Sequence, residues 1–144
     1  MKTGLVIFAH GSRLESANQA VRAVAASVAT AAGHELVEAA FLDCVAPDLP
    51  SAVDRLVRRG AERILVLPYF LTLGRHAAED LPHRIAEAAR MYPGLPIHTA
   101  APMGGHPALV QVLLDRAREA LEELQAGSGA PVGPEPSSPS AAKR

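Results

Sequence analysis

Three segments of the sequence place a side chain that could bind a metal just beyond an apolar run. His10 and Asp43 each follow such a run directly, and His76 ends a segment that starts where a third run finishes, at Pro68. In a parallel sheet the carboxyl ends of the strands meet at one edge, where ligands bind. Two imidazoles and a carboxylate suit a divalent first-row metal and leave coordination positions open. The sequence therefore predicts a metal site built from His10, Asp43 and His76.

The segment around His76 contains a second pattern. His76, Asp80 and His83 have the spacing of residues that share one face of a helix. Pro82 fits the first turn of a helix better than its interior, so we expect the regular helix to begin near it, at Leu81. His76 then lies in the approach to the helix, Asp80 is a capping residue or orients its surroundings, and His83 is an exposed helix residue.

The other histidines and the single cysteine have simpler explanations. His34 follows a glycine that ends a predicted helix and His98 lies within a predicted strand, so neither is expected at the functional edge. His106 lies in a glycine turn before a proline, and we expect it to be at most a neighbour of the substrate. Cys44 is interpreted as a small buried hydrophobic residue, and a lone cysteine fits a reducing compartment.

Four predicted strands alternate with four predicted helices. Strands joined by helices imply right-handed crossovers and a parallel sheet covered on both faces. The fold class is therefore α/β, a three-layer sandwich with a parallel four-stranded sheet. The segment 69–80 is longer than this fold needs, which favours a functional site there. The predicted strands are 4–9, 36–42, 63–67 and 96–100, and the predicted helices are 17–32, 47–59, 81–91 and 107–125.

Composition limits the domain organisation and the partners. Of the 144 residues, 126–144 are almost wholly Gly, Ser, Pro and Ala, which predicts a disordered tail after one domain, 1–125. The formal net charge is −1 with both signs interspersed, so no extended basic surface is expected for nucleic acid. The apolar stretch near the N-terminus is too short to span a bilayer, and we expect no membrane association and a cytoplasmic protein.

Several classes of chemistry lack their motifs. The sequence has no zinc-finger cysteine pairs, no phosphate-binding glycine loop ending in Lys-Ser or Lys-Thr, and no serine nucleophile elbow. Nucleotide chemistry therefore has no support. Two other hypotheses stay open: a carrier that binds a metal without turnover, and an unrelated α/β enzyme whose histidines serve hydrolysis or isomerisation.

Five motifs in order carry a resemblance that covers nearly the whole predicted domain. They are His10-Gly11-Ser12-Arg13, Ala40-Phe41-Leu42-Asp43 followed by Pro47, Gly60-Ala61 before a strand that ends in Pro68, Gly74-Arg75-His76 with Asp80-Leu81-Pro82, and His106-Pro107. In these motifs the chain resembles the short, single-domain class II tetrapyrrole chelatases, the sirohydrochlorin cobalt/iron chelatase family of the CbiX and SirB type.

The resemblance implies nucleotide-independent insertion of Co²⁺, Fe²⁺ or Ni²⁺ into sirohydrochlorin, for cobalamin, sirohaem or a related cofactor, with the metal as substrate and no permanently bound cofactor. By position, His10 and His76 would be the metal-binding and catalytic histidines. Asp43 would be an acidic ligand that is often Glu in the family, and its shorter side chain leaves coordination through water as an alternative. The sequence does not separate the roles of the two histidines, although we favour His10 as the proton acceptor and His76 as the residue that holds the metal. The alternative is a non-catalytic carrier of the metal or the tetrapyrrole that uses the same histidines.

The resemblance also suggests how the substrate is held. Sirohydrochlorin carries many carboxylates, which Ser12, Arg13 and Arg75 could bind by charge-assisted hydrogen bonds. Each arginine taken singly is equally well explained as a solvated surface charge. Longer chelatases of this class enclose the tetrapyrrole between two similar lobes. A single lobe is therefore expected to form a homodimer with the cleft between its subunits.

Overall fold

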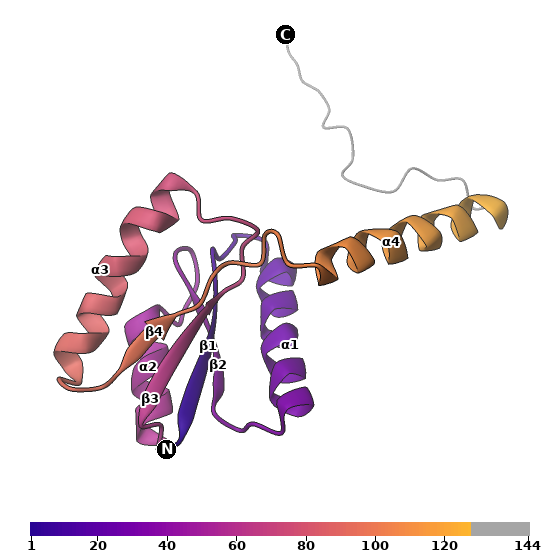
Figure 1. Ribbon diagram of the computed structural model, residues 1–144. Coiled ribbons are helices and arrows are strands. Elements are labelled where there is room, and N and C mark those ends of the chain that lie inside the picture. The colour runs from indigo at the N-terminus through magenta and orange to yellow at the C-terminus, as the bar shows by residue number, and fades with distance from the viewer. Residues whose placement is uncertain (128–144) are drawn as a thin grey trace, which may run out of the picture. The chain divides into compact units, whose positions relative to one another are not determined.

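The structure, a computed structural model, describes residues 1–127 and has the α/β architecture that the sequence predicts (Figure 1). Four strands form one parallel sheet in the order β2-β1-β3-β4. The strands are β1 (Thr3–Ala9), β2 (Val37–Phe41), β3 (Arg63–Pro68) and β4 (Ile97–Thr99). The helices are α1 (Glu15–Ala32), α2 (Leu49–Arg58), α3 (Arg75–Met91) and α4 (Ala108–Gln125).

The sheet separates two apolar cores. Helix α1 covers one face, where Val21 and Ala25 pack on Ile7 and Phe41. Helices α2 and α3 cover the other face, as Figure 1 shows. The core on that side is larger and contains Val6, Phe8, Leu49, Val53, Leu56, Ile64, Val66, Ala77 and Leu81. Because β1 alternates its side chains between the two faces, its residues contribute to both cores and the strand is buried throughout its second half.

The parallel arrangement gives the sheet two chemically different ends, which we call the carboxyl edge and the amino edge after the strand ends that lie there. At the carboxyl edge the strands end and the next helices begin, so helix N-termini with their free N–H groups gather there. At the amino edge the helices end and their carbonyl groups gather instead. Every predicted site residue follows a strand, and all of them therefore lie on the carboxyl edge.

The start of α3 differs from the prediction. The helix begins at Arg75 rather than Leu81, and Pro82 lies inside it. Proline in a helix interior removes one backbone hydrogen bond. That loss is offset because Ala77 is fully buried and Leu81 is 4% exposed, so the turns before and beside the proline pack on the core. The long loop expected over 69–80 is accordingly shorter and ends at Gly74, the N-cap of α3.

Helix α2 also begins later than predicted. Asp48 is its N-cap, and its carboxylate Oδ1 accepts a hydrogen bond from the Ser51 N–H at 2.9 Å. The side-chain cap fixes the first helical residue as Leu49, two positions after Pro47.

Residues 1–105 form one compact unit, and the described residues from His106 onward belong to a second. The sheet and helices α1 to α3 belong to the first, and within the described part of the second the only helix is α4. Most of the tail predicted over 126–144 lies outside the described residues, and the boundary at residue 125 stays a prediction. None of the helices in residues 1–127 has the length and apolar character required to cross a membrane.

Candidate functional site at the carboxyl edge

His10 directly follows β1, and its imidazole is held by an aromatic contact. The ring packs edge to face against Phe70, with centroids 4.8 Å apart and planes at 85°. Phe70 follows β3 and is 8% exposed, and it packs in turn on Phe8 in the core. No hydrogen bond or ion pair within residues 1–127 engages either ring nitrogen of His10. The ring is therefore anchored to the core while both nitrogens stay available to a metal or a proton.

The loop after His10 is fastened to α1 by Asn18. The Ser12 N–H donates to Asn18 Oδ1 at 2.9 Å, and Asn18 Nδ2 donates to the Ser12 carbonyl at 2.8 Å. Asn18 is 2% exposed and is the buried polar residue of the described chain. Sequence reasoning missed both Asn18 and Phe70. The available signal for Asn18 was a lone amide on the apolar face that it shares with Val21 and Ala25.

Asp43 follows β2, and its loop is joined to the loop of His10. The Asp43 N–H donates to the His10 carbonyl at 2.9 Å. Gly11 has φ of 86°, and a Cβ atom there would lie 2.0 Å from the Asp43 carbonyl oxygen, so only glycine fits between the two loops. The Asp43 carboxylate accepts a hydrogen bond from the Cys44 N–H at 2.8 Å. The two loops thus hold His10 and Asp43 in a fixed relation.

The structure corrects the expectation that Cys44 is buried. It was interpreted as a small buried residue, but its side chain is exposed. The reason is local, because Cys44 has φ of 72° in the turn capped by Asp43, and that turn lies on the carboxyl edge rather than under a helix.

His76 occupies the first turn of α3, and its partner is Asp80. The His76 Nε2 and Asp80 Oδ2 atoms are 3.1 Å apart, one helical turn along the chain. The expectation that His76 precedes the helix is therefore wrong, because α3 starts six residues before Leu81 and brings His76 and Asp80 onto one face. Both side chains are solvent-accessible, at 77% and 37%.

The arginines at this edge stand apart from most others in the described chain. Arg13 and Arg75 are exposed and have no ion-pair or hydrogen-bond partner among residues 1–127, a property shared there only with Arg90. The other arginines of the described residues contact a carboxylate or a hydroxyl; they are Arg22, Arg55, Arg58, Arg59, Arg63, Arg84, Arg116 and Arg118. Two of the three free guanidinium groups therefore flank the predicted site.

Ser12, the other residue predicted to bind the substrate, has a hydroxyl group that accepts a hydrogen bond from the Leu14 N–H at 3.0 Å.

Large apolar side chains are exposed on the same loops. Leu14 is 66% exposed and follows His10 by four residues, while Tyr69 and Leu71 flank Phe70 and are 38% and 61% exposed. The carboxyl edge therefore combines a free imidazole, two free guanidinium groups and uncovered apolar surface. Within the described residues no three His, Cys, Asp or Glu side chains form a ready-made metal cluster. His10, Asp43 and His76 as one ligand set consequently stay a prediction.

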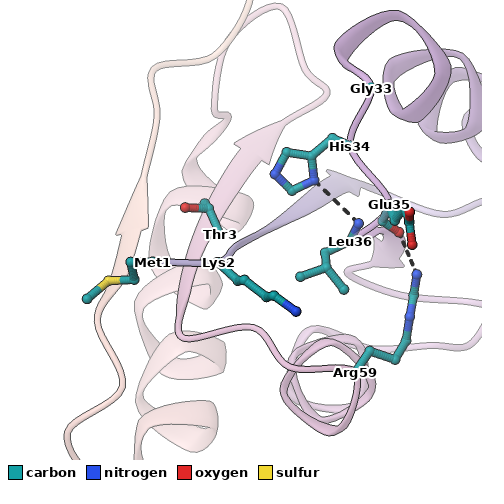
Figure 2. A pocket seen from close by; sticks show the side chains of 8 residues that line it. All are labelled: Met1, Lys2, Thr3, Gly33, His34, Glu35, Leu36 and Arg59. Atoms are coloured by element: carbon teal, nitrogen blue, oxygen red, sulfur yellow. Dashed lines mark hydrogen bonds between the residues drawn. The ribbon is translucent and has the colours of Figure 1, made fainter.

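A cavity of about 410 Å³ lies at the opposite, amino edge of the sheet (Figure 2). Two of the three basic side chains that line it have protein partners: Arg59 binds Glu38 at 2.9 Å and the Glu35 carbonyl, and His34 Nδ1 accepts the Leu36 N–H, whereas Lys2 contributes an ammonium group. Helices α1 and α2 end beside it, and the negative ends of their dipoles disfavour an anionic ligand. The residues that line it are Met1, Lys2, Thr3, Gly33, His34, Glu35, Leu36 and Arg59.

Comparison with known proteins identifies the relatives of this chain. The sequence model of the CbiX family matches residues 4–120. The chloroplastic sirohydrochlorin ferrochelatase of Arabidopsis thaliana is 32% identical over 122 residues, which cover 85% of this chain and 54% of the plant protein. The sirohydrochlorin cobaltochelatase of Methanopyrus kandleri is 28% identical, over 83% of this chain and 97% of the archaeal protein. The chain thus spans about half of the first relative and nearly all of the second.

Two solved structures agree with the match to the CbiX family. A putative cobalamin biosynthesis CbiX protein from Marinobacter aquaeolei is 29% identical with a TM-score of 0.72, over 84% of this chain and 98% of that protein. The sirohydrochlorin chelatase SirB of Bacillus subtilis subspecies spizizenii, solved in complex with cobalt, is also 29% identical, with a TM-score of 0.76. This chain is covered to 83% by that match and the SirB chain to 51%.

Proposed function

The chain belongs to the CbiX family, and on that basis we propose that it is a sirohydrochlorin chelatase, which inserts cobalt, ferrous iron or nickel into the tetrapyrrole. The observation that carries the proposal is the imidazole of His10. It is anchored on Phe70 at the carboxyl edge, with both nitrogens free, in a chain that matches the family over residues 4–120. We also propose that the enzyme works in the cytoplasm.

The chemistry requires a metal with open coordination positions and a base. As the divalent metal binds the four pyrrole nitrogens, two pyrrole N–H protons leave, and the net charge balances without a nucleotide. Histidine can hold the metal and can accept a proton near neutral pH. We assign His10 and His76 to these tasks. Asp43 completes the metal site, either directly or through water, since its carboxylate already accepts the Cys44 N–H.

The neighbouring residues suit the substrate. A sirohydrochlorin-type tetrapyrrole is a wide, flat macrocycle with carboxylates around its rim. The exposed side chains of Leu14, Tyr69 and Leu71 offer apolar surface to the ring face. Arg13 and Arg75, which have no protein partner in residues 1–127, offer guanidinium groups to the carboxylates, and Ser12 adds a hydroxyl.

We further propose that the working form is a homodimer. One subunit presents one wall to the macrocycle, whereas two copies related by a two-fold axis would enclose it. Sedimentation across a dilution series, run beside the activity assay, tests this arrangement. Full turnover per subunit at concentrations where the protein is monomeric would contradict it and would leave the metal site unaffected.

The decisive experiment is a metallation assay. Purified protein is mixed under anaerobic conditions with sirohydrochlorin and with Co²⁺, Fe²⁺ or Ni²⁺ supplied separately, and the visible spectrum is followed against a blank without protein. A chelatase gives multiple turnovers of metallated product. A carrier that uses the same histidines would bind both substrates yet release the macrocycle unmetallated, and that outcome would overturn the proposal.

A further inference from the structure

We infer that Asp80 is a positioning residue for His76: it holds the proton of the imidazole on Nε2 and thereby makes Nδ1 the atom that binds the incoming metal. The inference rests on the proposed function for the identity of the metal site. It goes beyond that function because it separates the roles of the two histidines, which the sequence leaves open.

The geometry comes from the early start of α3. Because the helix begins at Arg75, His76 and Asp80 are successive residues on one face, and their Nε2 and Oδ2 atoms lie 3.1 Å apart. The carboxylate places a negative oxygen beside Nε2, so it favours the neutral tautomer with the proton on Nε2 over the one that would turn the Nε2 lone pair toward that oxygen. The lone pair then lies on Nδ1, which has no partner within residues 1–127.

The consequence for metal binding follows from the chemistry of imidazole. A carboxylate beside the second nitrogen of a histidine ligand fixes the tautomer and the ring orientation of that ligand. His76 is therefore prepared to hold a divalent metal. His10 has an aromatic neighbour but no carboxylate partner, so either of its nitrogens can exchange a proton. The structure thus favours His76 as the metal holder and His10 as the proton acceptor.

The neighbouring acid supplies a matched control. Glu79 also lies in α3, carries the same charge and has no partner in the described chain. Replacing either acid by alanine, a strong helix former, keeps the helix and removes one negative charge. Only Asp80→Ala removes the contact with His76.

The test measures Co²⁺ affinity of the protein without tetrapyrrole, together with kcat and both KM values in metallation. For Asp80→Ala we expect about 10- to 100-fold weaker Co²⁺ binding and a higher metal KM, with the sirohydrochlorin KM unchanged. Glu79→Ala should resemble the wild type, and Asp80→Glu should recover part of the loss. Asp80→Ala added to His76→Ala should have no further effect, because Asp80 acts through that imidazole.

Either of two results in the single variants would overturn the inference: Co²⁺ affinity of Asp80→Ala equal to the wild type, or an equal loss in Glu79→Ala. A full additional loss in the double variant would likewise show that Asp80 acts independently of His76. If the wild-type protein binds Co²⁺ but never metallates sirohydrochlorin, the proposed function fails, while the Co²⁺ titrations still decide the role of Asp80.

Discussion

The two edges of the sheet carry similar residue types in opposite states. At the carboxyl edge His10, Arg13 and Arg75 have no polar partner in residues 1–127, and the apolar side chains around them are exposed. At the amino edge His34 and Arg59 line a cavity, but both are engaged by neighbouring backbone or carboxylate groups. A hollow with basic residues is therefore not sufficient for a binding site. Unsatisfied polar groups on anchored loops are the more informative feature.

Backbone direction explains the difference. Helices run antiparallel to the strands they follow, so free N–H groups gather at the carboxyl edge and free carbonyl groups at the amino edge. Basic residues at the amino edge complement the helix ends, as Arg55 and Arg58 do in the last turn of α2. At the carboxyl edge basic residues have no such structural task, which leaves them available to a ligand.

The largest expected effect comes from removing a histidine of the carboxyl edge, compared with removing one of the amino edge. His10→Ala and His76→Ala should each lower the metallation rate about 100-fold or more, because the metal loses a ligand or the leaving pyrrole proton loses its acceptor. His34→Ala at the amino edge is the control and should keep the wild-type rate. The rates are measured from the visible spectrum after subtraction of uncatalysed insertion. Near wild-type turnover by either carboxyl-edge variant would remove that histidine from the mechanism.

Two glycines with positive φ, one at each edge, allow the stability of the two edges to be compared. Gly11 and Gly33 have φ of 86° and 59°, so alanine at either position costs about 1–2 kcal/mol in backbone strain. At Gly11 the new Cβ would also meet the Asp43 carbonyl oxygen at 2.0 Å, whereas nothing lies within 4 Å at Gly33. Gly11→Ala should therefore destabilise the fold by about 1–3 kcal/mol more than Gly33→Ala. Urea unfolding measures both, and equal values would show that the two loops separate at little cost.

Sequence reasoning predicted the fold because the signals were repeated along the chain. Continuous apolar runs indicated buried parallel strands, and Gly33 marked the end of α1 correctly. The start of α3 was wrong because the local penalty of Pro82 was weighed without the burial of Ala77 and Leu81, which only the tertiary structure reveals. The placement of His10 beside Phe70 was equally out of reach, since it depends on the pairing of β1 with β3.

The site residues were predicted from the order of the strands and from single polar residues that follow them. That reasoning places His10 and Asp43 on the same edge but says nothing about partners. The pairing of His76 with Asp80 and the two bonds from Asn18 to Ser12 are side-chain contacts, which have no periodic signal in a sequence.

Asp43 should matter less than the histidines if it acts through water. Asp43→Asn keeps a side-chain oxygen for the Cys44 N–H and removes only the charge, so the turn should stay folded. We expect about a tenfold lower metallation rate, the lower end of what an outer-shell partner of a metal contributes. A loss as large as that of His10→Ala would instead indicate direct ligation. Measuring the metal KM at saturating sirohydrochlorin separates the two outcomes.

The exposed apolar side chains should affect the macrocycle and leave metal binding unchanged. Leu14→Ser and Leu71→Ser are each expected to raise the sirohydrochlorin KM about fivefold, the loss of roughly 1 kcal/mol of apolar burial. Met91, the last residue of α3, is 48% exposed at the opposite end of that helix from His76, and Met91→Ser is a control that also replaces an exposed apolar side chain by serine. The Co²⁺ affinity should be unchanged in all three variants. Equal effects on the KM in the control would show that general surface hydrophobicity is responsible.

The smallest effect concerns the cap of α2 at the carboxyl edge. Burial of the Asp48 carboxyl raises its pKa, but its hydrogen bonds with Ser51 outweigh burial and bring the pKa below its usual value. A depressed pKa stabilises the fold above the unfolded-state value, near 4, and this contribution is lost as the pH falls through the folded-state pKa. The loss should be below about 1 kcal/mol, the typical value of a cap. Asp48→Asn keeps an acceptor that does not titrate. Between about pH 7 and about pH 3, which spans the usual pKa range of carboxyl groups, the unfolding free energy of this variant should therefore change less than that of the wild type. An identical pH dependence in urea unfolding would show that Asp48 is not the group responsible.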